Sequence, residues 1–249
     1  KQILGMEVLG GRYATKGITG LTEEFLSSPH PVEKVWRHGK AIVFDLASQQ
    51  HIVVTLGMTG KFSLVKEKHA AVEFRYGDAH DKNYFYFVDQ RRFGTVRIVP
   101  SSSLKKTLPK IGWDPLSEEA NAEKIFNDLS EDDRPIGTIL LESRDFSGVG
   151  NYLRAEILYA ARISPWRLGK DLTMDEVALM CREARRICLR SYELGGNTIE
   201  NFEALDGGTG KFFEEIKVYG KKKDPEGNDV RSEKTPEGRT IHWVPEVQS

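Results

Sequence analysis

A glycine turn followed by a helical run is the feature of this sequence best suited to bind a ligand. Residues 147–151 read Ser-Gly-Val-Gly-Asn, and the amphipathic run that follows ends just before a proline. Without a Cβ at Gly148 and Gly150, the backbone can approach a ligand closely. With Asn151 as the N-cap, the first free amides and the positive end of the helix dipole would face that ligand. This arrangement favours binding of an anion, and a phosphate is the usual one.

The plainer interpretation is a corner between two helices whose glycines serve only packing, and for Gly-x-Gly alone it is the more common one. The flanking residues favour the binding interpretation instead. Residues 135–143 are predicted to form a preceding helix, so the turn joins two helices and presents its loop outward.

This order of elements resembles the helix–two-turn–helix of the formamidopyrimidine-DNA glycosylase and endonuclease VIII family, which grips the phosphates beside a damaged base. Five further motifs occur in the family's order and approximate spacing. They are Arg37-His38-Gly39-Lys40, Leu56-Gly57-Met58-Thr59-Gly60, Asp89-Gln90-Arg91-Arg92-Phe93-Gly94, Gly195-Gly196-Asn197-Thr198 and residues 238–248, Gly-Arg-Thr-Ile-His-Trp-Val-Pro-Glu-Val-Gln. One such match arises easily by chance, but five in order do not. The resemblance covers nearly the whole chain.

The resemblance assigns Met58, Arg91 and Phe93 to the gap that an extruded base leaves behind. An enzyme that acts on a base must take it out of the stack, at an energetic cost. Apolar wedges in the gap, and an arginine that bonds the orphaned partner base, recover part of that cost. Methionine and phenylalanine are more often core residues. The glycines beside them (Gly57, Gly94) favour exposed turns, where a wedge belongs.

Further contacts with DNA are implied by the same resemblance. Lys40 would reach into the active site and contact a phosphate, although sequence alone indicates only a solvated strand end. His69 matches a phosphate contact more weakly, because a second histidine often found two residues later is Ala71 here. Arg239 matches the phosphate-binding arginine, a role that suits its planar fork. The complete predicted DNA-binding set is Met58, His69, Arg91, Phe93, Gly148, Asn151, Tyr219 and Arg239, with Lys40 as the catalytic-site residue.

The C-terminal segment departs from the pattern of many family members, which carry a zinc finger with two Cys-x-x-Cys pairs. Here residues 244–247 read Val-Pro-Glu-Val, and no cysteine follows Cys188. Zinc cannot bind in that way, so we expect no metal and no cofactor. The segment resembles the zincless finger of some relatives, held by apolar packing.

The beginning of the chain departs further. Family enzymes start with Pro-Glu followed by a helix; the proline amine attacks C1′ to form a Schiff base, and the glutamate transfers a proton. This sequence begins Lys1-Gln2-Ile3, which aligns with a strand beyond that helix. We expect a fragment, or else a truncated binder without catalysis. Lys40 is a poor substitute amine, because an exposed lysine is mostly protonated at neutral pH.

Composition excludes a membrane protein and leaves nucleic-acid binding open. With 249 residues, 29% charged and 39% hydrophobic, the chain suits one large or two modest soluble domains, and no apolar run could span a membrane. The net charge of −1 counts mildly against a nucleic-acid partner, although lysines cluster at Lys217 and residues 221–223. Cys181 and Cys188 lie two turns apart on one predicted helix, too far for a disulfide. We expect buried thiols in an intracellular monomer, located in the cytoplasm, nucleoid or nucleus.

The pattern of the chain predicts an α+β fold. Residues 41–46, 51–56 and 84–88 alternate like strands of a β-sandwich. A capping box at Thr173–Glu176 predicts a long helix that ends at Gly195-Gly196, and residues 215–248 a β-hairpin around a turn at 224–229. The predicted domains are a β-sandwich over 1–115, a linker with a short helix over 116–134, the helix–two-turn–helix domain over 135–213 and the hairpin over 214–249.

The resemblance implies a base-excision-repair glycosylase with AP (β/δ-elimination) lyase activity on oxidised bases in double-stranded DNA. The alternative is a non-catalytic module that recognises damaged, abasic or bent duplex. A protein-interaction or RNA-binding module is a third class, disfavoured because it needs no wedge. The preferred lesion stays open between purine and pyrimidine, although the glycine-rich loop 202–213 could close over an extruded base.

Overall fold

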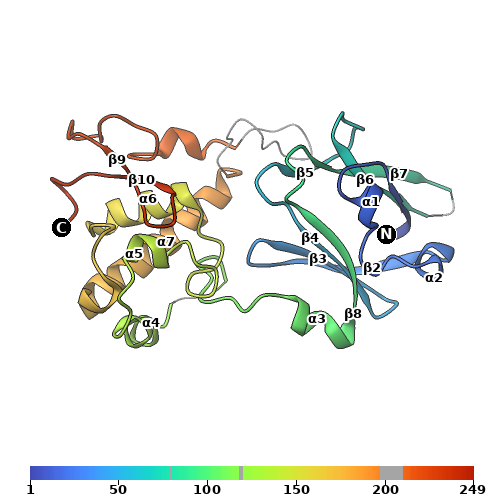
Figure 1. Ribbon diagram of the computed structural model, residues 1–249, viewed down its shortest axis with the longest axis horizontal. Helices are drawn as coiled ribbons and strands as arrows, with labels where there is room; N and C mark the ends of the chain where they lie inside the picture. Colours follow the sequence, from blue (N-terminus) through green and yellow to red (C-terminus); the bar gives the residue numbers. More distant parts are fainter. Residues whose placement is uncertain (79, 118–119, 197–209) are drawn as a thin grey trace. The chain divides into compact units, whose positions relative to one another are not determined.

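The computed structural model describes residues 1–78, 80–117, 120–196 and 210–249 (Figure 1). The described residues form two compact units, the first of residues 1–109 and the second of residues 110–196 and 210–249. No helix in these described ranges is long and apolar enough to cross a membrane. Each unit has its own hydrophobic core.

The first unit is built on one antiparallel sheet in the order β5-β7-β6-β1-β2-β3-β4-β8. Its strands are β1 (Gln2–Val8), β2 (His30–His38), β3 (Ala41–Leu46), β4 (Gln50–Thr55), β5 (Gly60–Ser63), β6 (Ala70–Gly77), β7 (Lys82–Asp89) and β8 (Thr95–Pro100). The first residues of β2 pair with β1 and the remainder with β3, so β2 belongs to both halves of the sheet. The predicted strands at 41–46, 51–56 and 84–88 are confirmed within a residue or two.

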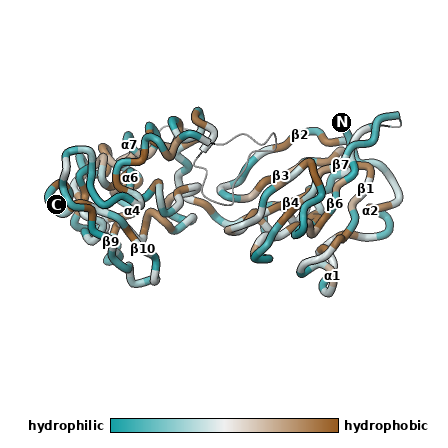
Figure 2. Tube along the Cα trace, turned by 90° about the horizontal axis from the view of Figure 1, so that it is seen from above, coloured by the Kyte–Doolittle hydropathy of each residue, from teal (hydrophilic) through white to brown (hydrophobic). Residues whose placement is uncertain are grey.

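The two halves of this sheet face each other across a shared core, which confirms the predicted β-sandwich. Phe74 of β6 and Phe87 of β7 are buried together with Ile52 of β4 and Ile98 of β8. Phe44 of β3 packs against Phe85 of β7, with their ring centroids 6.4 Å apart. Burial of apolar area from both layers is what holds them together. Figure 2 shows hydrophobic stretches in β3 and β4.

Three short helices accompany the sheet within residues 1–109 of the described chain: α1 (Tyr13–Lys16), α2 (Glu23–Ser27) and α3 (Ser101–Thr107). Thr22 caps α2 by accepting a hydrogen bond from the Phe25 amide at 3.1 Å. Helix α3 was not predicted, and the reason is that none of its residues is buried. Without a buried stripe, a helix leaves no apolar periodicity in the sequence.

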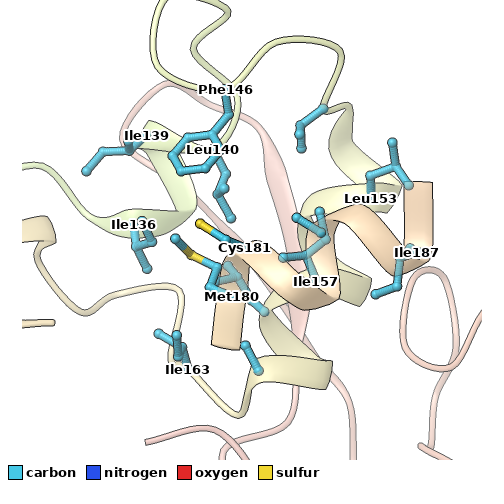
Figure 3. Packing of buried hydrophobic residues seen from close by; sticks show 14 of the residues in the cluster. Ile136, Ile139, Leu140, Phe146, Leu153, Ile157, Ile163, Met180, Cys181 and Ile187 are labelled. Carbon is cyan, nitrogen blue, oxygen red and sulfur yellow. The ribbon is translucent and has the colours of Figure 1, made fainter. Parts of the chain in front are cut away.

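The second unit is helical with a small hairpin. Its α-helices are α4 (Ala122–Leu129), α5 (Ile136–Ile139), α6 (Asn151–Ala161) and α7 (Met174–Glu193), and its 3₁₀ turns are η1 (Gly169–Asp171) and η2 (Phe212–Glu215). Figure 3 shows how Ile136, Phe146, Ile157 and Met180 meet in its core. Residues from α5, α6 and α7 thereby share one buried cluster, which sets the corner between α5 and α6 against the longest helix.

The predicted long helix is confirmed at both ends. Thr173 and Glu176 form the reciprocal capping box at the start of α7. The helix ends at Glu193, and Gly195 and Gly196 follow with φ of +74° and +82°, values that favour glycine. The buried stripe is the predicted one, Val177, Met180, Ala184, Ile187 and Cys188. Cys181 and Cys188 are buried thiols, and burial raises the pKa of Cys181 to about 12.

Two local predictions in this unit are wrong. The helix expected over 135–143 ends at Ile139, because the amides of Leu141 and Glu142 bond to carbonyls three residues back, in turns rather than a continuing α-helix. Asn151 is also not an N-cap: Gly150 occupies that position without a side-chain cap, and Asn151 is the first helical residue of α6.

The C-terminal hairpin forms at another turn than the predicted one. Its strands are β9 (Arg231–Lys234) and β10 (Thr240–Trp243), so the connecting turn is 235–239 and not 224–229. The segment 224–229 is a separate loop, closed by the Asp224 carboxylate, which accepts hydrogen bonds from the amides of Glu226 and Asn228. Both segments carry proline and glycine, and only pairing across the hairpin distinguishes them.

Candidate nucleic-acid interface

Three connections of the first unit emerge at the same end of neighbouring strands. The pairing places Ala41 opposite Thr55 and Thr55 opposite Thr95. Lys40 precedes the first of these residues, the segment 56–60 follows the second, and the segment 90–94 precedes the third. The sheet register therefore brings Lys40 and the two glycine-containing loops to one edge.

Asp89 fastens the two loops to each other. This carboxylate, 5% exposed, accepts a hydrogen bond from the Thr59 hydroxyl through Oδ1 at 2.8 Å and from the Gly94 amide through Oδ2 at 2.7 Å. The Thr59 hydroxyl in turn accepts a hydrogen bond from the Arg91 amide at 3.0 Å. Residues 56–60 and 89–94 thus form one hydrogen-bonded assembly, called here the wedge platform.

Glycine is required where the two loops of the wedge platform touch. Gly57 has φ of +64°, and a Cβ there would lie 2.9 Å from the Gly94 nitrogen. At Gly94 a Cβ would lie 2.7 Å from the Thr55 carbonyl oxygen. Such contacts are shorter than side chains tolerate, so Gly57 lets the two loops touch and Gly94 lets its loop approach the end of β4. The glycines predicted as turn markers also allow the loops to pack on each other.

The wedge platform presents its large side chains to solvent. Met58 is 58% exposed and Phe93 57% exposed, so the alternative that they are core residues is wrong. The Arg91 guanidinium lies 5.1 Å from the centre of the Phe93 ring, within the range of a cation–π contact. An exposed methionine and phenylalanine beside an arginine are a group of side chains able to occupy a gap between bases.

His69 lies next to the wedge platform. Its carbonyl accepts a hydrogen bond from the Asp89 amide at 3.1 Å, and its side chain is exposed. Lys40 is exposed in the turn between β2 and β3. The five residues predicted for this unit therefore all lie at exposed positions of connecting loops. Thr59 and Asp89, which hold the two loops of the wedge platform together, were not predicted as site residues, and their only signal was their place inside the two quoted motifs.

The second unit holds the predicted phosphate-binding turn. Gly148 has φ of +80°, and a Cβ at Gly148 or Gly150 would meet no atom within 4 Å. The turn is therefore open on the side where side chains would project, and helix α6 starts directly after it. Its first amides have no carbonyl partner within the helix, as at any helix N-terminus, and remain free to bind an anion.

The side chain of Asn151 does not cap the helix but bonds to Thr240 and Arg154. Its Nδ2 donates to the carbonyl of Thr240 at 2.9 Å, and its Oδ1 accepts from the Arg154 guanidinium. Asn151 thereby joins the start of α6 to the first residue of β10. This contact explains why the side chain does not cap its own helix.

Arg239 and Tyr219 lie on two turns of the C-terminal segment. Arg239 is exposed, and its carbonyl accepts hydrogen bonds from the amide and the hydroxyl of Thr235 at 2.8 and 2.9 Å. Tyr219 is half-buried with its ring 5.0 Å from that of His242. Its amide and those of the two preceding residues donate to the carboxylate of Glu156, a buried residue of α6 that was missed. Glu156 thus fixes the turn that carries Tyr219.

Comparison with known sequences covers both units. Sequence models match the formamidopyrimidine-DNA glycosylase N-terminal domain at residues 3–96, its H2TH domain at 111–203 and its C-terminal domain at 209–249. A formamidopyrimidine-DNA glycosylase of Mycoplasma genitalium is 32% identical over 195 residues, with 76% of this chain and 68% of that protein covered. The chain belongs to the formamidopyrimidine-DNA glycosylase family. The corresponding protein of Escherichia coli is 32% identical over 208 residues, covering 82% and 76%.

Solved structures of the family agree with the fold. The crystal structure of the protein from Thermus thermophilus is similar with a TM-score of 0.85 at 30% identity, covering 99% of this chain and 91% of that one. A complex of the Lactococcus lactis protein with DNA containing an abasic site has a TM-score of 0.84 at 27% identity, covering 100% and 93%. These matches confirm the predicted family and its α+β fold.

The C-terminal segment, expected to resemble a zincless finger, packs through an apolar cluster. Val244 is fully buried with Ala155 and Tyr159 of α6 and with Val218. Gln248 closes the end of the segment: its Oε1 accepts from the Val244 amide at 2.7 Å and its Nε2 donates to the Ile163 carbonyl at 2.9 Å. Among the residues that the structure describes, no group of three or more His, Cys, Asp or Glu could hold a metal ion. Valine offers no metal ligand, so packing holds this segment.

Part of the predicted site lies outside the described residues. Asn197 and Thr198 of the Gly-Gly-Asn-Thr motif belong to it, as do residues 202–209 of the loop expected to close over a base. The predicted residues Met58, His69, Arg91, Phe93 and Lys40 gather in the first unit, and Gly148, Asn151, Tyr219 and Arg239 in the second.

Proposed function

We propose that this member of a base-excision-repair glycosylase family removes oxidised bases from double-stranded DNA and cleaves the resulting abasic site as a lyase. The observation that carries the proposal is the wedge platform, in which Met58, Arg91 and Phe93 are exposed on loops locked by a buried carboxylate. Large side chains held at the surface in this way cost solvation without contributing to the core. Filling the space of an extruded base gives them a function.

In the proposed binding mode the two side-chain types of the wedge platform divide the work. Met58 and Phe93 would contact the faces of the bases that flank the gap, replacing lost stacking. Arg91 would donate hydrogen bonds to the base left without a partner. An arginine suits this because its donors are planar and lie in the plane of a base edge.

The second unit would hold the sugar–phosphate backbone. The open turn at Gly148 and Gly150 leads into α6, whose first amides favour an anion, and Arg239 adds a positive charge on the hairpin turn. Contacts of this kind orient a duplex without reading its sequence. They suit an enzyme that must bind any sequence and respond only to damage.

The partner we propose is duplex DNA that contains an oxidised base or an abasic site, bound by a monomer inside the cell. Solved complexes of the Lactococcus lactis protein contain DNA with Fapy-dG, with an oxidised pyrimidine and with an abasic site. These lesions include both purine and pyrimidine products, and the described residues favour neither class.

The direct test is fluorescence anisotropy with matched duplexes that carry an abasic analogue or no lesion. We expect tighter binding of the abasic duplex, and loss of most of that preference in Met58→Ala/Phe93→Ala. Val35→Ala, which truncates an exposed apolar residue of β2, is the matched control and should leave the preference intact. Equal binding of both duplexes by the unmodified chain would contradict the proposal.

A further inference from the structure

We propose that Arg154 is a positioning residue that holds the Arg239 turn in register with the start of α6, so that both elements bind the same DNA backbone. The inference rests on the proposed function in one respect, namely that Arg239 and the start of α6 contact phosphates. Arg154 itself makes no such contact in this proposal. It acts through the hairpin turn.

The burial of Arg154 rules out a direct role at the surface. It is 0% exposed, although arginine is among the residues that are almost never fully buried unless paired. It projects from the first turn of α6, three residues after Asn151. A cation in this position cannot reach a phosphate without displacing its neighbours, so its effect on DNA must be indirect.

The hydrogen bonds of Arg154 join three segments. Its Nη1 donates to the Gly137 carbonyl of α5 at 2.9 Å. Its Nη2 donates to Asn151 Oδ1 at 2.5 Å and to the Thr240 carbonyl at 3.2 Å. The side-chain amide of Asn151 donates to the same Thr240 carbonyl at 2.9 Å. Thr240 directly follows Arg239, so the clamp ends one residue from the proposed phosphate contact.

A second contact holds the same turn from its other side. The Thr138 hydroxyl of α5 donates to the carboxylate of Glu237, which lies two residues before Arg239. Residues 237 and 240 are thus both tied to the corner between α5 and α6. The position of Arg239 is therefore set by that corner through two contacts. Arg154 supplies the buried one, to the Thr240 carbonyl.

The guanidinium is held by neutral carbonyls and an amide oxygen, without a carboxylate in contact among the described residues. Burial lowers the pKa of Arg154 to about 10, with Glu237 as an opposing influence, so the side chain stays charged at neutral pH. Its Nε has no partner within the described part of the chain. Such a site has a considerable desolvation cost, and a residue with that cost is expected to serve precise placement of its partners.

The test is a double-mutant cycle with Arg154→Met and Arg239→Ala, measured as duplex affinity across a salt series. We expect each single change to weaken binding about tenfold and to lower the log–log salt slope by roughly one. The double variant should bind about as weakly as either single one, because both remove the same contact. A residue with a merely structural role would leave the log–log salt slope unchanged. A lowered slope for Arg154→Met therefore supports a positioning role.

Controls separate positioning from a general loss of stability. Arg185→Met removes another arginine that donates to a backbone carbonyl, that of Pro115, in the same unit, and should not change the slope. Arg154→Lys should retain the charge and recover part of the affinity. If Arg154→Met does not fold, as judged by circular dichroism, Arg154→Lys replaces it in the cycle and must still be non-additive with Arg239→Ala.

The results that overturn the inference differ from those that overturn the proposed function. Additive losses in the cycle, or an unchanged salt slope for a folded Arg154 variant, would show that Arg154 does not position Arg239. An unmodified chain that fails to prefer the abasic duplex contradicts the function instead. In that event the cycle on undamaged duplex still decides whether Arg154 acts on Arg239.

Discussion

The wedge platform of the first unit and the proposed phosphate-binding turns of the second expose side chains of opposite character. The wedge platform keeps Met58 and Phe93 exposed, with buried Asp89 hidden beneath them. In the second unit the exposed residue is the polar Arg239 and the buried one is again polar, Arg154. In both places a buried charged side chain positions an exposed one, but the surface is apolar in one unit and cationic in the other.

The difference follows from what each surface is proposed to contact. A base stack responds to apolar volume in the gap, whereas a phosphate responds to charge and to amide donors. The first kind of contact exists only at a lesion, and the second exists along any duplex. Damage recognition and general affinity should therefore be separable by mutation.

Among the changes that test this comparison, Asp89→Ala is expected to have the largest effect. The change leaves the Thr59 hydroxyl and the Gly94 amide without their acceptor and should destabilise the protein by about 2–4 kcal/mol. Urea unfolding measures the loss, and preference for abasic duplex should fall with it. Asp78→Ala is the matched control, since Asp78 also accepts two backbone amides but is exposed, and a smaller loss is expected. Equal losses would mean that the buried carboxylate has no special role.

Arg91→Ala and Arg239→Ala sharpen the comparison directly. Arg239→Ala should weaken damaged and undamaged duplex alike, about tenfold, and flatten the salt dependence by roughly one unit of slope. Arg91→Ala should weaken binding mainly of the lesion duplex, because its proposed partner base is exposed only there. Anisotropy on both duplexes across a salt series decides. The opposite pattern would require the two roles to be exchanged.

Borohydride trapping on abasic duplex examines the chemistry of the first unit. A polypeptide of these 249 residues, with nothing before Lys1, should bind this duplex and form no covalent adduct, since exposed lysines are mostly protonated. Denaturing electrophoresis detects the adduct. If one forms and is lost in Lys40→Ala, Lys40 supplies the amine and the wedge platform adjoins a catalytic centre.

The smallest effect is expected from a chelator. Val244 and Val247 pack against apolar neighbours of α6, so removal of divalent metal should change neither the melting temperature nor DNA affinity. Stoichiometric zinc in the purified protein, lost together with the melting transition, would refute the apolar finger. The measurement needs metal analysis and a thermal scan before and after chelation.

Local signals in the sequence were enough where one element decides its own structure. The capping box at Thr173 and the stripe from Val177 to Cys188 determined α7, because both depend on residues within a few turns. Glycines beside Met58 and Phe93 indicated exposed turns for the same reason. The family motifs then supplied the assignment of these turns to DNA, which their chemistry alone left open.

Contacts between distant residues were decided only in the tertiary structure. The wedge platform depends on Asp89 meeting Thr59, thirty residues apart, and the Arg154 clamp on Thr240, eighty-six residues apart. The same holds for the hairpin turn at 235–239, which competes in the sequence with an equally good turn at 224–229. The partner of a turn residue or of a single charged side chain cannot be predicted from the sequence. A hydrogen bond forms only where packing brings the partner's backbone close. The sequence thus determined α7 and the exposed turns of the wedge platform, and packing determined the hairpin register and which buried charges hold the exposed side chains in place.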